Sequence, residues 1–208
     1  SAIRLTTARY HTPTGRSIQK PYDEGTDKYF NDLANRSNSG ELVSAENISF
    51  PDSLKFYTKF NKRVVYGGGG IMPDYFIPVD TTRISAFYSR LLRRGVLNTF
   101  GIEYTNRKRE MLQAKYKDVA SFIQGFEVTD ELLESLFAYA GTQGISPDEE
   151  GTDPSDAFMR NQLKGLIARN LFDFSAYIQV TALMDEAYLR ALEIIQDDTF
   201  GRLNIRYR

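Results

Sequence analysis

The spacing of the apolar residues changes near Asp80, and this change constrains the architecture that the chain can adopt. Before it, short runs rich in Ile, Val, Thr and Tyr alternate with turn residues, which is typical of strands and loops. After it, apolar residues recur at helical spacing. The first such stripe consists of Ile84, Phe87, Tyr88, Leu91 and Leu92. The sequence therefore predicts an α+β protein, with a strand-containing domain over residues 1–80 and an all-helical bundle over residues 81–208.

A strand, a turn and a second extended run are predicted at the start of the chain. Residues 3–10 are rich in Ile, Leu, Thr and Tyr, which suit a pleated surface. Residues 12–15 read Thr-Pro-Thr-Gly, where Pro fixes one dihedral angle and Gly tolerates a positive φ. Because a strand needs neighbours, we expect residues 1–80 to belong to a larger fold.

Four further elements are expected before Asp80. Residues 27–36 and 53–60 have the apolar spacing of short helices. Residues 63–66 form a short strand candidate that leads into four glycines, and residues 75–79 form another.

The first helices after Asp80 have recognisable ends. Thr82 is the expected N-cap of the first helix, and Gly95 stops or kinks it. The apolar pattern then continues to about Lys115, and residues 118–123 predict a shorter helix that ends at Gly125.

Three further helices are expected after these. Thr129 is a good cap for a helix over residues 128–140, because acidic residues follow it in the first turn. Asp153 and Pro154 predict the start of the next helix. A continuous apolar seam predicts one long final helix over residues 174–196.

Two sequence blocks in the first domain carry a family resemblance. The first is Leu5-Thr6-Thr7-Ala8-Arg9-Tyr10, with Pro13 and Gly15-Arg16-Ser17-Ile18-Gln19. The second is Gly68-Gly69-Gly70-Ile71-Met72-Pro73-Asp74 with the strand candidate that follows. Together they resemble the end of the core of carboxy-terminal processing (tail-specific) proteases, peptidase family S41. The resemblance covers about the first 80 residues, and the helical remainder is similar only to the variable tail of some members.

The resemblance implies a hydrolase whose serine nucleophile, lysine general base and peptide-binding PDZ module precede Ser1. No matching nucleophile motif and no Phe-Gly-Lys-Gly-like turn occur in these 208 residues, so no catalytic residue can be assigned. The implied function is the C-terminal fragment of a serine endopeptidase, acting in proteolysis as a scaffold or a substrate- or partner-binding part. The implied location is the periplasm or cell envelope. A non-catalytic protein-binding or assembly module is the alternative.

Arg9 and Arg16 are the candidate substrate-binding residues. Both lie in the first block, on either side of the turn, and a guanidinium can hold a carboxylate through two hydrogen bonds. The structural alternative, which we favour, is that they pair with acidic residues that precede Ser1 and anchor the strand.

Metal and cofactor sites are not expected. The chain has no Cys, and its one histidine, His11, stands beside the predicted turn. The glycines at positions 67–70 could form an anion-binding turn, but they lack the Gly-Lys-Ser/Thr ending of a nucleotide loop.

Charge is balanced overall but unevenly distributed. The chain has 26 Lys and Arg against 27 Asp and Glu, a net charge of −1, so no global field attracts nucleic acid. Residues 81–126 hold nine basic and three acidic residues, whereas residues 127–156 hold nine acidic residues and no basic one. We expect pairing between these segments or attraction of a partner. The family resemblance implies polypeptide substrates as partners, and the open edge expected of the first strand would allow self-association. No apolar run is long enough to span a membrane.

Overall fold

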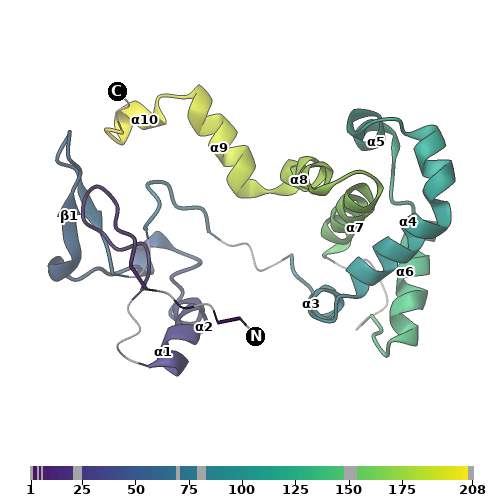
Figure 1. The fold of residues 1–208 in the computed structure, drawn as a ribbon, viewed down its shortest axis with the longest axis horizontal. Helices are drawn as coiled ribbons and strands as arrows, with labels where there is room; N and C mark the ends of the chain where they lie inside the picture. Colours follow the sequence, from purple (N-terminus) through teal and green to yellow (C-terminus); the bar gives the residue numbers. More distant parts are fainter. Residues whose placement is uncertain are drawn as a thin grey trace. The chain divides into compact units, whose positions relative to one another are not determined.

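The computed structural model describes residues 2–3, 5, 7–20, 25–68, 71–78, 83–147 and 154–205. The chain divides into two compact units, of which the first comprises Ser1–Val79 with Glu193–Arg208 and the second comprises Asp80–Leu192. The described residues are mostly helical and include a small two-stranded antiparallel sheet, which is an α+β composition (Figure 1).

Short elements make up the first unit. In chain order they are α1 (Thr26–Phe30), α2 (Asp32–Asn38), the 3-10 turns η1 (Ala45–Asn47) and η2 (Asp52–Leu54), β1 (Lys55–Tyr57), β2 (Val64–Tyr66) and α10 (Thr199–Arg202). The helix predicted over residues 27–36 is present as α1 and α2, which are separated at Asn31.

The sheet of the first unit pairs β1 with β2. Phe56 lies opposite Val65, and Lys55 and Tyr57 lie opposite Tyr66 and Val64. Exposure alternates along β1 with a period of two, because Phe56 is partly buried between two exposed neighbours. The helix predicted over residues 53–60 is therefore wrong, because η2 ends at Leu54 and the strand β1 follows it. The strand predicted over residues 63–66 is confirmed by β2.

The strands predicted over residues 3–10 and 75–79 are also wrong for the residues that the structure describes. Residues 2–3, 5 and 7–10 form no ladder, and a single bridge joins His11 to Ser17. Residues 75–78 form no strand, and Val79 lies outside the described residues. Ile3, Leu5 and Tyr10 are 86%, 77% and 79% exposed, and strand-forming side chains alone do not make a strand without a partner.

All secondary-structure elements that the structure describes in the second unit are helical. Its elements are α3 (Ala86–Arg93), α4 (Val96–Lys115), α5 (Val119–Gly125), α6 (Asp130–Thr142), α7 (Asp156–Leu171), α8 (Phe174–Thr181), the 3-10 turn η3 (Ala182–Met184) and α9 (Glu186–Gln196). The division between the units falls within α9, after Leu192.

Side-chain caps and a glycine set the helix ends. Ser85 accepts a hydrogen bond from Tyr88 N and caps α3, and Thr82 lies outside the described residues. Gly95 separates α3 from α4 with a φ of 66°. Asp118 caps α5 in a capping box with Ser121, and Thr129 caps α6, as its sequence predicted.

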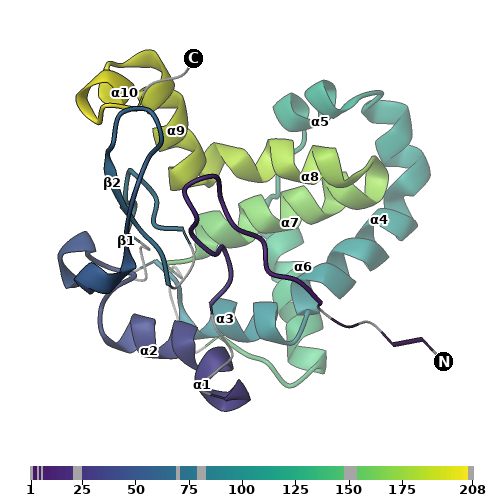
Figure 2. The same cartoon turned by 60° about the vertical axis from the view of Figure 1, so that its left-hand side comes forward.

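Helix α7 forms the centre of the second unit. Its most extensive contacts are with α4 and α8, and Figure 2 shows it lying alongside α8. Its buried residues are Met159, Leu163, Gly165, Leu166, Ile167, Ala168 and Leu171. A Cβ at Gly165 would lie 2.8 Å from Thr181 Cγ2 and 3.0 Å from Tyr177, so the absence of a side chain permits the close approach of α8.

The long helix predicted over residues 174–196 is interrupted. It ends at Thr181, continues as η3 and restarts as α9, because Asp185 accepts hydrogen bonds from Ala187 N at 2.9 Å and Tyr188 N at 3.1 Å. An aspartate that accepts from the following backbone N–H groups begins a new helix. The apolar seam therefore spans two helices. Of the start predicted at Asp153 and Pro154, Asp153 lies outside the described residues, and α7 begins at Asp156.

We predict that Met159→Ala destabilises the second unit by about 2–5 kcal/mol, because a fully buried side chain leaves a cavity when it is truncated. Met111 lies on α4 and is 50% exposed, so Met111→Ala is the matched control and should cost no more than about 0.5 kcal/mol. Urea unfolding followed by far-ultraviolet circular dichroism measures both. Equal losses would contradict the assignment of Met159 to the core.

We predict that the Asp118 cap loses its effect in acid. The pKa of Asp118 is lowered from its ordinary 3.8, first by the backbone N–H of Ser121 and then by its hydroxyl. Because the pKa of Asp118 is lower in the folded chain than in the unfolded chain, its charged form stabilises the fold at pH values above the unfolded-state pKa. This contribution is lost as the pH falls through the folded-state pKa. The difference in unfolding free energy between the natural chain and Asp118→Ala should be present at pH 7 and shrink below about pH 4. A difference that does not change with pH would refute the charged cap.

Candidate functional site

The turn of the first sequence block packs against the end of β2. Arg16 Nη1 donates to Tyr66 O at 3.4 Å, and Arg16 Nε donates to Thr14 Oγ1 at 3.1 Å. A Cβ at Gly67 would lie 3.4 Å from Arg16 Cγ and 3.0 Å from the Phe56 ring. The first block therefore meets the strand that leads into the second block.

Backbone hydrogen bonds hold this turn. Thr12 N donates to Arg16 O, and Gly15 N donates to Thr12 O, each at 2.8 Å. Gly15 has a φ of 92°, in the region that favours glycine. His11 is exposed, and its Nδ1 lies 3.0 Å from Gly15 O, so it takes part in the turn.

The two candidate arginines have different environments. Arg16 is partly buried, and its guanidinium bonds the turn to β2. These hydrogen bonds anchor the turn to β2, and their acceptors are a hydroxyl and a backbone carbonyl. Arg9 is exposed and lies in residues 7–10, outside any strand.

A second arginine of the first unit binds the second sequence block, and sequence reasoning missed it. Arg63 Nη1 donates to Asp74 Oδ1, which ties the residue before β2 to the aspartate of the Ile-Met-Pro-Asp segment. No sequence signal pointed to this pair, because the two residues are 11 positions apart.

A cavity of about 260 Å³ lies beside these elements. Charged residues of α2 and the following loop line one side, and apolar residues line most of the remainder. The lining consists of Asp32, Arg36, Glu41, Ile48, Ser49, Phe50, Pro51, Leu54, Gly67, Gly68, Ile71, Met72 and Pro73. The second sequence block thus forms part of a pocket wall, which its resemblance did not predict.

Ion pairs organise the charged side of this cavity. Arg36 Nε donates to Glu41 Oε2 at 2.9 Å, and Ser39 Oγ donates to Glu41 Oε1 at 3.2 Å. Asp32 Oδ1 accepts from Lys20 Nζ. Both carboxylates are therefore compensated by neighbouring donors.

The two lysines whose pKa is shifted differ in direction. The hydrogen bond from Lys55 to Asp52, at 2.5 Å, raises the pKa of Lys55, with a smaller effect from Tyr66. Desolvation lowers the pKa of Lys164, and Glu127 opposes this effect. Lys164 Nζ donates to Ile123 O at 2.7 Å, so this lysine stabilises the last turn of α5.

Two arginines of the basic segment of the second unit donate to backbone carbonyls near the end of α6. Arg90 donates to Ser146 O at 2.9 Å, and Arg94 donates to Gln143 O at 3.4 Å. These carbonyls follow the C-terminal end of α6, where positive charge is favoured. Residues 148–153, which include four of the acidic residues, lie outside the described part.

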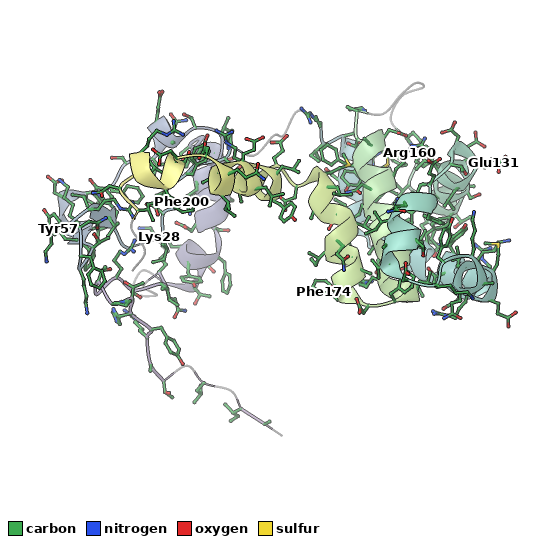
Figure 3. The ribbon with its side chains drawn as sticks, turned by 90° about the horizontal axis from the view of Figure 1, so that it is seen from above. Lys28, Tyr57, Glu131, Arg160, Phe174 and Phe200 are labelled. Atoms are coloured by element: carbon green, nitrogen blue, oxygen red, sulfur yellow. The ribbon has the colours of Figure 1, made fainter. Side chains whose placement is uncertain are left out.

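Arg160 on α7, labelled in Figure 3, joins the start of α7 to the segment that leads into α6. It donates to Asp156 at 2.7 Å, to Asp130 at 2.6 Å and to Val128 O at 2.6 Å. The first contact has the i, i+4 spacing that a sequence can reveal. The other two come from residues that are 30 and 32 positions away.

Two classes of site receive no support from the described residues. Within them, no group of three or more His, Cys, Asp or Glu side chains is arranged to hold a metal ion. No helix in the same part of the chain is long and apolar enough to cross a membrane.

Comparison with known proteins identifies one region. Residues 87–173 match the model of a family of unknown function (DUF8443). This region runs from the first turn of α3 to just beyond α7, and it lies wholly within the second unit. No curated protein matches the chain, and no solved structure matches it. The peptidase resemblance of the first 80 residues stays a prediction.

We predict that Gly68→Ala disrupts the end of β2. Gly68 has a φ of 95°, and an added Cβ would lie 2.5 Å from Leu54 Cδ1, so we expect a loss of at least about 1–2 kcal/mol. Hydrogen exchange of the Val65 amide, which lies opposite Phe56 in the ladder, and of the Gly67 amide, which donates to Leu54 O, measures this loss.

Gly141→Ala is the matched control, because Gly141 lies in α6 and nothing lies within 4 Å of its added Cβ. This variant should stabilise the second unit by about 0.4–1 kcal/mol. Unchanged exchange in Gly68→Ala would show that the close packing of Leu54 is not required.

Proposed function

We propose that this chain is the C-terminal part of a serine endopeptidase of the carboxy-terminal processing type, peptidase family S41. Its first unit acts as a scaffold, and the serine nucleophile and lysine general base lie in sequence that precedes Ser1. The two sequence blocks support this assignment, because they occur in the order that the family resemblance implies. Polypeptides are the substrates of this peptidase, and the periplasm or cell envelope is its location.

One observation carries the scaffold role: the first unit has little core of its own. Among the described apolar residues that are buried, Val65 belongs to the first unit and the others belong to the second. Ile3 and Leu5 of the first block, and Phe60 after β1, are 86%, 77% and 75% exposed. Exposed apolar side chains such as these stabilise a fold only when another surface covers them. A peptidase core is the surface that the resemblance supplies.

The contacts of Arg16 and Arg63 support the same role. Each guanidinium joins a segment of the resemblance blocks to one end of β2. In a peptidase of this type, the lysine acts as a base when desolvation lowers its pKa, so its backbone must be held in place. An anchored turn next to that lysine would hold it there, and Arg16 is then a positioning residue.

The second unit favours the alternative function of protein binding or assembly. It has a continuous buried core from Phe87 to Val180, so its helices support one another. On its surface Phe174, labelled in Figure 3, is 63% exposed and stacks on Tyr177 at 5.7 Å. Ile178, one turn further along α8, is 48% exposed. Adjacent exposed apolar groups of this kind are typical of protein-binding surfaces.

The test begins with the coding sequence that precedes Ser1. We expect it to contain a serine nucleophile motif and a Gly-Lys-Gly-like turn. The longer gene product should cleave casein, and alanine at the motif serine or lysine should abolish that cleavage. Arg16→Met in the longer product should lower kcat without changing the circular dichroism of the helices.

The 208-residue chain alone is the control, and we expect no cleavage by it. Absence of both motifs from the preceding sequence would rule out the peptidase and favour the binding module. Serine-dependent cleavage by the pure 208-residue chain would overturn the scaffold role.

A further inference from the structure

We infer that α9 docks an amphipathic helix of a partner protein, and that this partner helix carries lysine or arginine beside its apolar stripe. Such a partner would serve the protein-binding function proposed above as the alternative, on which the inference rests. It requires neither peptidase activity nor the cavity of the first unit. An uncovered apolar helix face and an excess of acidic residues around it point to this partner.

Helix α9 contains no buried residue. It has 11 residues, and isolated helices shorter than about 12–15 residues are only marginally stable in water. Helices in folded proteins are stabilised mostly by the packing of an apolar face. Because no side chain of α9 is buried, a surface that covers its apolar face would stabilise this helix.

The apolar side chains of α9 form one stripe. Tyr188, Leu192 and Ile195 have the i, i+4, i+7 spacing that places side chains on one face of a helix. They are 46%, 40% and 68% exposed. Ala191 is also exposed and lies beside them, and its small side chain lets another helix approach closely. A stripe of this kind matches the apolar face of an amphipathic partner helix.

The segment that contains this stripe is strongly acidic. Residues 173–198 include one basic residue, Arg190, and six acidic residues, which gives a net charge of −5. Glu186, at the start of α9, already lies 3.7 Å from the guanidinium of Arg83, and both side chains are more than half exposed. Charges beside an apolar seam select the partner of a helix. Lysine or arginine beside the stripe of the partner would therefore complement α9.

The same charge disfavours two other occupants of an apolar helix face. A second copy of the chain would bring two segments of net charge −5 together, and like charges repel across an interface. A lipid surface binds amphipathic helices whose polar face is rich in lysine and arginine. The opposite face of α9 carries Glu186, Arg190 and Glu193 instead, again at i, i+4, i+7 spacing. A basic partner helix meets neither obstacle.

The experiment is a titration of the ¹⁵N-labelled 208-residue chain, followed by NMR, with designed peptides. The first peptide is four helical turns long and carries leucine at helical spacing and lysine elsewhere. The second has glutamate in place of lysine, and the third has the residues of the first in an order without an apolar stripe. We expect the first peptide to shift the Tyr188 and Leu192 amides. The other two should bind at least roughly 10-fold more weakly.

Several results would overturn the inference. They are no shift at millimolar lysine peptide, equal binding of the lysine and glutamate peptides, dimerisation of the chain through α9, and larger shifts with phosphatidylcholine vesicles than with the peptide. Shifts confined to Phe174 and Ile178 would refute the site on α9 but leave the protein-binding function in place. Hydrolysis is not measured in these titrations, so their outcome is independent of the proposed peptidase activity.

Leu192→Gln tests the apolar stripe. Glutamine forms helices about as well as leucine, so α9 should be retained. We expect this variant to bind the lysine peptide roughly 3- to 10-fold more weakly. Leu92→Gln is the matched control, because Leu92 lies in α3 and is 43% exposed, close to the 40% of Leu192. Its affinity should not change, and equal losses in the two variants would refute the assignment.

The double variant Glu186→Gln with Glu193→Gln tests the charges, and both side chains are exposed. We expect it to bind the lysine peptide roughly 3- to 10-fold more weakly and the glutamate peptide more tightly. Glu131→Gln with Glu134→Gln removes the same charge from exposed positions on α6 and is the matched control. Circular dichroism checks that the helices are intact in both. Equal effects of the two double variants would show a response to net charge alone and refute the site.

Discussion

Within each unit, neighbouring elements pack closely at glycines, because no side chain keeps them apart. In the second unit, Gly165 lets Tyr177 and Thr181 of α8 approach α7, and an added Cβ at Gly101 would lie 3.3 Å from Leu166 Cβ. In the first unit, Gly67 and Gly68 admit Phe56 and Leu54 in the same way. Because interiors are as dense as organic crystals, one methyl group at such a position displaces a neighbour. The neighbouring helices and the cavity wall therefore depend on these positions.

The two units differ in how much apolar surface they bury. The second buries a continuous cluster that extends from α3 to α8, which is the pattern of a helical bundle that is stable by its own packing. The first relies on a three-residue ladder, a turn and a few ion pairs. A two-stranded ladder is only marginally stable in water. This contrast agrees with a scaffold role for the first unit and a binding or assembly role for the second.

The candidate site could be predicted only in part from the sequence. Arg16 was singled out because it lies in a resemblance block, and it does contact β2. Arg36 and Arg63 were missed, since neither belongs to a motif and their roles arise from folding. The cavity joins α2 to residues more than 30 positions further along the chain, including Ile71 and Met72. Sequence spacing carries no signal for contacts at such separations.

Local signals in the sequence determined most of the second unit. Gly95, Asp118 and Thr129 act at the helix ends through hydrogen bonds or dihedral angles of their immediate neighbours, so they can be recognised from sequence. Tertiary structure decided what depends on distant partners: whether residues 3–10 pair as a strand, and where Asp185 interrupts the final apolar seam. A strand is stabilised by hydrogen bonds to a neighbouring strand, whereas a helix forms its backbone hydrogen bonds within its own segment.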